Sequence, residues 1–128
     1  MNFNELIVGH ILANVLGIEP EKVLGFKKLS GGLTNSSYLC ETAEGKFVFR
    51  APGKDTDKII NREHEKKSLE LAKELGIDPT YVCMNSYHGW KISKYEKNCY
   101  MPDYHNFEDS KLIIKKLKDL HNKKAHVD

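Results

Sequence analysis

The sequence contains few of the residues that mark special classes of protein. Its three cysteines, Cys40, Cys83 and Cys99, are odd in number and form no Cys-x-x-Cys pair. This argues against a disulfide framework and a zinc site, and predicts free thiols in a reducing cytosol. No apolar run is long enough to span a bilayer, and the segment "MNFNELIVGHILANVLG" lacks the basic start and cleavage site of a signal peptide. We therefore expect a cytoplasmic protein.

Positive and negative charges are also nearly balanced in this sequence. The formal net charge is +2 over 128 residues, which is too small to indicate binding to nucleic acid or to a membrane surface. An apolar content of 40% and a charged content of 30% are typical of a soluble globular protein. Only two cations are arginines, Arg50 and Arg62, so each raises the question of a geometry that lysine does not supply.

Hydrophobic periodicity and turn residues predict an α+β fold. The first helix is expected over 4–16, with Ile7, Ile11 and Val15 on one face and Gly17 as its stop. A long helix is expected over 55–76, capped by Asp55 or Thr56. Strands are predicted at 23–29, 36–43, 46–51, 80–87 and 89–95. The order predicts a five-stranded antiparallel sheet with the long helix inserted after the third strand.

A last helix is predicted over 110–124, with an apolar stripe formed by Ile113, Leu117 and Leu120. Little sequence follows it that could cover this stripe. We therefore expect the chain to be part of a longer protein, or to bury the stripe by self-association.

The stretch "KKLSGGLTNSSY" separates the first two predicted strands. Gly31 and Gly32 allow positive φ and a close approach of the backbone to a ligand, and successive N–H groups in such a loop can bind an anion. Several hydroxyl and amide side chains add further donors. A simple hairpin turn remains an alternative, because a Gly-Gly pair between strands is common in hairpins.

Arg50 ends the third predicted strand, where alternation places it on the same face as Val48. It is either an arginine that reaches solvent or a guanidinium aimed at an anion and held by a carboxylate. Glu63 and Glu65 of the following helix are both candidates, and spacing does not choose between them. A Gly-rich loop, a strand that ends in a cation and a helix with a carboxylate form the layout of a kinase-like nucleotide-binding lobe.

Six stretches, in order, strengthen this interpretation: "LSGGLTNSSY", "FVFRAPG", "INREHE", "AKELGIDP", "GWKISKY" and "LKDLH". They resemble the N-terminal part of the choline kinase family, in its bacterial LicA-like branch, within the aminoglycoside-phosphotransferase-like superfamily. The resemblance runs from about Leu24 to His121. It implies a protein-kinase-like N-terminal lobe at 1–95, and a connector with the first helix of a C-terminal lobe at 96–128.

The resemblance also implies roles for individual residues. Arg50 takes the place of the kinase lysine and contacts phosphate, Glu65 pairs with it, and Arg62 is structural. Val48 lines the adenine pocket, and Lys94, Tyr95 and Glu96 form the hinge that offers backbone groups to adenine. The phosphate-covering loop, with Ser37 at its end, comprises Gly31, Gly32, Leu33, Thr34, Asn35 and Ser36.

The catalytic half of such an enzyme is missing from the sequence. The family's H-x-D-x-x-x-x-N loop and its acidic metal motif do not occur, so no catalytic residue or Mg²⁺ ligand is predicted here. The resemblance implies that the intact protein transfers phosphate from ATP to choline, and that this chain alone is inactive. Two alternatives remain: a kinase for another small alcohol, such as an aminoglycoside or thiamine, and a stand-alone nucleotide-binding or interaction module.

Overall fold

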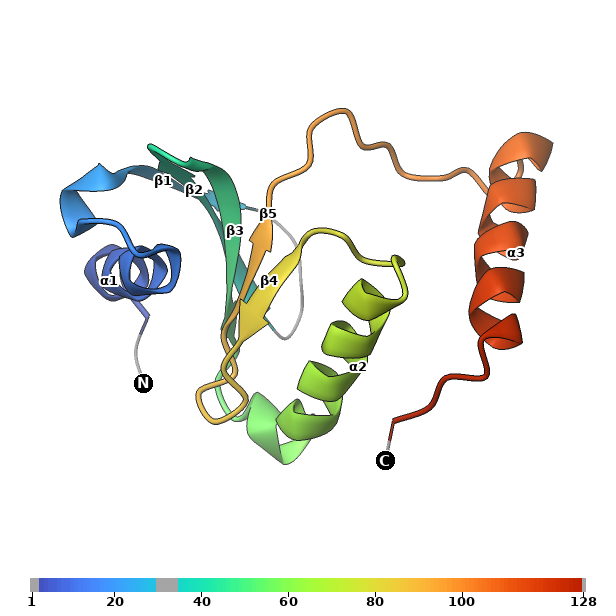
Figure 1. Cartoon of the computed structure of the whole chain (residues 1–128). Helices are drawn as coiled ribbons and strands as arrows, with labels where there is room; N and C mark the ends of the chain where they lie inside the picture. The colour runs from blue at the N-terminus through green and yellow to red at the C-terminus, as the bar shows by residue number, and fades with distance from the viewer. Residues whose placement is uncertain (1–2, 30–34, 128) are drawn as a thin grey trace.

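A computed structural model describes residues 3–29 and 35–127. Five antiparallel strands form one sheet in the order β1-β2-β3-β5-β4, with α1 on one side and α2 on the other (Figure 1). This confirms the predicted α+β fold, including the helix after the third strand. The strands are β1 (Val23–Leu29), β2 (Asn35–Thr42), β3 (Gly45–Pro52), β4 (Tyr81–Met84) and β5 (Lys91–Lys94). The helices are α1 (Glu5–Leu16), α2 (Arg62–Glu74) and α3 (Phe107–Asn122), with short 3-10 turns η1 (Pro20–Lys22) and η2 (Thr56–Lys58).

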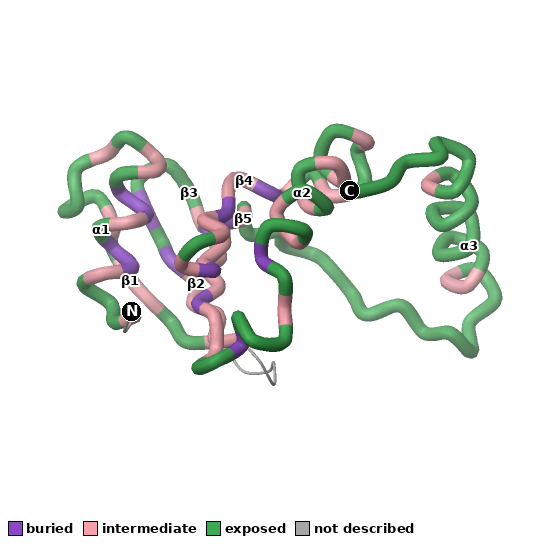
Figure 2. The backbone as a smooth tube through the Cα atoms, turned by 90° about the horizontal axis from the view of Figure 1, so that it is seen from below, coloured by how far each residue is buried: buried purple, intermediate pink, exposed green. Residues whose placement is uncertain are grey.

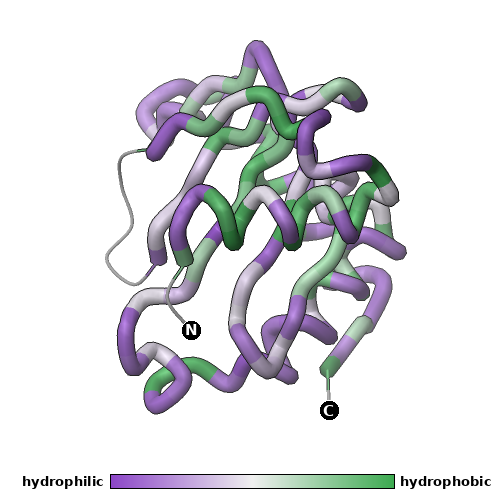
Figure 3. The backbone as a smooth tube through the Cα atoms, turned by 90° about the vertical axis from the view of Figure 1, so that its left-hand side faces the viewer, coloured by the Kyte–Doolittle hydropathy of each residue, from purple (hydrophilic) through white to green (hydrophobic). Residues whose placement is uncertain are grey.

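The main core lies between α1 and the sheet. On β3, Phe47, Phe49 and Ala51 are buried, as strand alternation requires, and they pack against Leu12 of α1 and Ile92 of β5. Viewed from the α1 side, hydrophobic segments occur in α1 and in the strands behind it (Figure 3). This packing fixes which face of the sheet is closed and leaves the opposite face for α2.

The buried stripe of α1 differs from the prediction by one position. The helix begins after Asn4, whose side chain accepts a hydrogen bond from the Ile7 N–H, and ends at Gly17, with φ 69°. Its buried residues include Val8 and Leu12, whereas Ile7 and the rest of the predicted stripe are only partly buried. Both stripes have helical spacing, and contact with the sheet selects the one centred on Leu12.

The long helix predicted over 55–76 begins later than expected. Asp55 has a left-handed backbone (φ 61°) and precedes only the short turn η2, and the extended backbone of Asn61 (ψ 100°) separates this turn from α2. The cap of α2 is Asn61, whose side chain accepts a hydrogen bond from the His64 N–H. Capping by Asp55 or Thr56 was therefore wrong, whereas Gly76, with φ 75°, lies just beyond the end of α2 as predicted.

Helix α3 lies apart from the sheet at the end of a long connector (Figure 1). Its residues are mostly exposed (Figure 2), including Ile113 and Leu117 of the predicted stripe, while Leu120 is half-buried. Within the described ranges, no helix is both long and apolar enough to cross a membrane. The cysteines are free thiols as predicted, with Cys40 buried and Cys99 exposed.

Candidate functional site

The face of the sheet that turns toward α2 carries the predicted functional side chains. Val48 and Arg50 alternate with the buried residues of β3, so they lie on the opposite face from α1. Antiparallel pairing places Ser37 of β2 and Lys91 of β5 directly beside Arg50. Residues paired in this way share a face of the sheet. The sheet therefore places two cations, Arg50 and Lys91, next to one another.

The helix carboxylate that pairs with Arg50 is Glu65. Arg50 Nη2 lies 2.6 Å from Glu65 Oε1, and the two side chains are 17% and 22% exposed. Glu63 points elsewhere and accepts a hydrogen bond from the Ser86 hydroxyl. The alternative that the sequence left open is thus decided by packing, and the predicted Arg50–Glu65 pair is present in the structure.

Arg50 retains unused hydrogen-bonding capacity in spite of this ion pair. Its Nε and Nη2 atoms are buried and have no hydrogen-bond partner among the described residues. Nη2 lies close to Oε1, but its N–H bonds do not point at that oxygen. The contact is therefore an ion pair without the geometry of a hydrogen bond. Buried donors are nearly always bonded in folded proteins, so an anionic acceptor would complete this site.

Glu65 is shared between two guanidinium groups. Arg62 Nη1 donates a hydrogen bond to Glu65 Oε2 at 2.6 Å, while Arg50 faces the other carboxylate oxygen. Burial raises the pKa of Glu65, but the side-chain interactions with Arg62 and then Arg50, together with the positive charges of both, outweigh it and hold this pKa below its usual range. The carboxylate is therefore ionised at neutral pH.

Arg62 is more deeply placed than the sequence indicated. It is 7% exposed, and its Nη2 donates to Thr56 Oγ1 at 2.9 Å and to Asn35 Oδ1 at 3.3 Å. Arg62 thus connects α2, the connector before it and the first residue of β2. The scarcity of arginine was the signal for this residue, whereas nothing in the sequence distinguished Lys91 from the other lysines.

Lys91 adds a second half-buried cation to this face. Burial and the nearby charge of Arg50 lower the pKa of Lys91, partly offset by Asp78 and Glu65. Among the described residues Lys91 forms no ion pair, and Arg50 shares the carboxylate of Glu65 with Arg62. The surroundings of Arg50 therefore favour an anion.

The phosphate-covering loop predicted from the sequence is only partly described. Gly31, Gly32, Leu33 and Thr34 lie outside the described residues. Asn35, Ser36 and Ser37 belong to β2, which begins one residue earlier than predicted. Ser37 pairs with Arg50, but Ser36 pairs with Ala51 and so lies on the α1 face. Of these three residues, Ser36 is therefore the one that faces away from Arg50.

The predicted hinge follows directly from the end of β5. Lys94 is the last residue of the strand, and Tyr95 and Glu96 begin the connector to α3. The Lys94 N–H is bonded to Thr80 O at 2.8 Å and the Tyr95 N–H to Lys46 O at 3.0 Å. These two donors are already used within the lobe, so an adenine contact here would have to use carbonyl groups or the Glu96 N–H.

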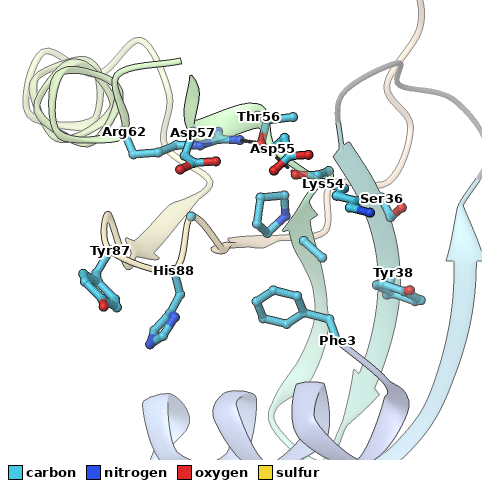
Figure 4. Close-up of a pocket in the computed structure, with 14 residues that line it drawn as sticks. Phe3, Ser36, Tyr38, Lys54, Asp55, Thr56, Asp57, Arg62, Tyr87 and His88 are labelled. Carbon is cyan, nitrogen blue, oxygen red and sulfur yellow. Dashed lines mark hydrogen bonds between the residues drawn. The ribbon is translucent and has the colours of Figure 1, made fainter. Parts of the chain in front are cut away.

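One large cavity does not coincide with the Arg50 face. It has a volume of about 820 Å³ and is lined by Phe3, Ser36, Tyr38, the segment 51–57 and the β4–β5 turn (Figure 4). Phe3, Ser36, Tyr38 and Ala51 belong to the α1 side of the sheet, and only Arg62 is shared with the cluster around Glu65. Chemistry favours the Arg50 face, because buried donors without a hydrogen-bond partner lie there. Of the two cations that line the cavity, Arg62 is already bonded and Lys54 is exposed to solvent.

A resident metal has no cluster of ligands in the part of the chain that the structure describes. No group of three or more His, Cys, Asp or Glu side chains is placed to hold an ion there. The residues present therefore do not fit a Mg²⁺ site by themselves, and no step through a metal is derived from them.

No protein-family model matches the sequence, and neither does any curated protein sequence. Solved structures do match. Choline kinase LicA from Streptococcus pneumoniae is 33% identical with a TM-score of 0.62, over 76% of this chain and 32% of that one. A structure of LicA in complex with AMP is 32% identical with a TM-score of 0.63, over 77% and 34% of the two chains.

A more distant match shares the fold. It is the phosphotransferase APH(2″)-IIa, solved as a ternary complex with streptomycin and ATP, at 19% identity and a TM-score of 0.50, over 80% of this chain and 32% of that one. The chain thus spans about a third of the length of the proteins that it matches. The described residues have the fold of a kinase-like N-terminal lobe.

Proposed function

We propose that this chain is the ATP-binding lobe of a choline-kinase-like small-molecule phosphotransferase. The observation that carries the proposal is the Arg50–Glu65 ion pair, 2.6 Å long, on the sheet face that also carries Val48. The similarity to choline kinase LicA, and to a structure of LicA in complex with AMP, supports a nucleotide as the ligand. Arg50 would bind phosphate oxygens with its free donors, and the glycine-rich loop that includes Gly31 and Gly32 would cover them.

In the intact protein the reaction would be ATP plus choline giving phosphocholine and ADP. The choline hydroxyl would attack the γ-phosphorus in line, and its proton would pass to a base outside this chain. Residues 96–128 would be the connector and first helix of the second lobe, which would supply that base and the Mg²⁺ ligands. An aminoglycoside or another small alcohol is the alternative acceptor, because acceptor contacts would also come from that lobe.

The test is calorimetric titration of ATP into the wild-type chain and into Arg50→Ala. Loss of a charge-assisted contact to phosphate is expected to weaken binding by about ten- to a hundredfold. Lys58→Ala is the matched control, because Lys58 is an exposed cation of η2 whose one ion pair among the described residues is with Asp55 at 3.5 Å. Equal affinity of wild type and Arg50→Ala would contradict the assignment of Arg50.

A second candidate function is an interaction module, favoured by the exposed apolar residues of α3. Leu112, Ile113 and Ile114 are 56%, 39% and 64% exposed, and Leu117 is 49% exposed. A surface of this kind is typical of a face that packs against another domain or a second copy. Light scattering distinguishes the two: a tight dimer that is indifferent to ATP favours the module, and a monomer that binds ATP favours the lobe.

A further inference from the structure

Arg62 occupies a position that is costly for a cation. It is the first residue of α2, where the helix dipole is positive, and its side chain is almost completely buried. Buried ion pairs are often no more stabilising than apolar side chains of similar size. The contacts that Arg62 makes therefore suggest a role beyond holding the fold together.

Those contacts have a definite direction. Thr56 Oγ1 donates to the Gly53 carbonyl at 2.9 Å, so this hydroxyl presents a lone pair to Arg62 Nη2. This hydrogen bond holds the Arg62 guanidinium against Thr56, in the segment between β3 and α2 (Figure 4). From this position, Arg62 Nη1 donates a hydrogen bond to Oε2 of Glu65.

The consequence for Arg50 follows from the two oxygens of Glu65. With Oε2 bonded to Arg62, only Oε1 faces Arg50, and Arg50 does not form the two parallel hydrogen bonds of a fork-on-fork pair. Nε and Nη2 of Arg50 consequently stay without hydrogen-bond partners. A carboxylate free to turn would satisfy these donors itself and compete with phosphate.

We infer that Arg62 is a positioning residue of the phosphate site: it holds Glu65 so that the carboxylate anchors Arg50 without consuming the donors that bind phosphate. Through its hydrogen bond to Asn35, Arg62 also fixes the start of β2, directly after the glycine-rich loop. The inference rests on the proposed function for its ligand, a nucleotide polyphosphate. The hydrogen bond from Arg62 to Glu65 and the ion pair between Glu65 and Arg50 are contacts within the chain, so they can be tested apart from nucleotide binding.

The first experiment measures the ATP affinity of the 128-residue chain in the wild type, Arg62→Gln, Glu65→Gln and the double variant. Arg62→Gln is expected to weaken binding by about ten- to a hundredfold, although Arg62 does not touch the ligand. In a Glu65→Gln background the same substitution is expected to change affinity by less than about threefold, because the carboxylate that it orients has gone. Lys67→Gln is the control, because it removes one exposed positive charge from the same helix, and affinity is expected to stay within about twofold.

Additive losses in this cycle would overturn the inference, because a purely structural role predicts the same loss with or without Glu65. Arg62→Lys covers the case in which Arg62→Gln does not fold. It keeps the charge but not the planar fork, so it is expected to weaken ATP binding by about tenfold. Unchanged affinity in Arg62→Lys, together with a clear loss in Arg50→Ala, would overturn the positioning role and leave the proposed function intact.

A second experiment tests the contacts between Arg62, Glu65 and Arg50 with no nucleotide added. The chain has only two arginines, so its ¹⁵N spectrum contains only two arginine Nε–H signals, and Arg62→Lys identifies them. Arg62→Lys is expected to move the Arg50 signal and slow its exchange with water, because Glu65 then bonds to Arg50. An unmoved Arg50 signal would overturn the inference, whether or not wild type binds ATP. Absence of ATP binding in wild type would refute the proposed function alone.

Discussion

Replacing Glu65 with glutamine tests the charge balance of the site most severely. The substitution leaves Arg50 and Arg62 facing a neutral amide, with side chains that are only 17% and 6% exposed. Removing one partner of a buried pair costs about 3–5 kcal/mol. The partial exposure of Glu65 and the acceptor oxygen kept by glutamine reduce this, so we expect a loss of about 2–3 kcal/mol.

Thermal unfolding followed by circular dichroism measures this loss. For a chain of this size the expected decrease in Tm is about 8–12 °C. Glu63→Gln is the matched control, because Glu63 lies two residues away, is exposed and bonds only to Ser86 among the described residues. Its Tm is expected to change by no more than about 2 °C.

The stabilisation that Glu65 provides is expected to depend on pH. The pKa of Glu65 is lowered in the folded chain, so its stabilisation is complete above the unfolded pKa of about 4.3. This stabilisation disappears as the pH falls through the lower folded pKa. The Tm difference between wild type and Glu65→Gln should therefore be constant from about pH 6 to 8 and shrink below about pH 4. Equal Tm values at pH 7, or a difference that does not shrink in acid, would refute the reasoning.

Two further predictions concern the surroundings of the site. Gly89→Ala should destabilise the chain by about 2–3 kcal/mol in urea unfolding, because Gly89 has φ +81° and an added Cβ would meet Pro52 at 3.1 Å and Arg62 Nε at 3.4 Å. Gly17→Ala, with φ +69° and open space, should cost only about 1 kcal/mol, and equal losses would contradict the close contact. Alkylation by iodoacetamide at pH 8, read by mass spectrometry, should modify exposed Cys99 first and Cys40 last, because burial raises the pKa of Cys40 to about 11. Early modification of Cys40 in the folded chain would contradict its placement in the core.

Much of the fold could be predicted because its signals are local. Alternation in β3 predicted the face shared by Val48 and Arg50, and Gly17 marked the end of α1. The error at Asp55 arose because Asp55, Thr56 and Asn61 are all residue types that cap helices. The hydrogen bond that the His64 N–H donates to the Asn61 side chain identifies Asn61 as the cap of α2.

The site was predictable in part for a different reason. Sequence order brought Arg50 and a helical carboxylate together, but choosing Glu65 over Glu63 by residues alone was impossible, since it depends on how α2 rotates against the sheet. The network of Arg62 was missed because its partners, Thr56 and Asn35, lie 6 and 27 residues away in sequence. Contacts at such separations are set by packing and leave no periodic pattern.

Methyl NMR of the chain during ATP titration shows directly which face of the sheet binds the nucleotide. Val48 and Leu39 pair with one another on the Arg50 side, whereas Val8 and Leu12 lie in the core on the α1 side. We expect ATP to shift the methyl signals of Val48 and Leu39 and to leave those of Val8 and Leu12 nearly unchanged. Shifts confined to Val8 and Leu12, with Val48 unmoved, would contradict it.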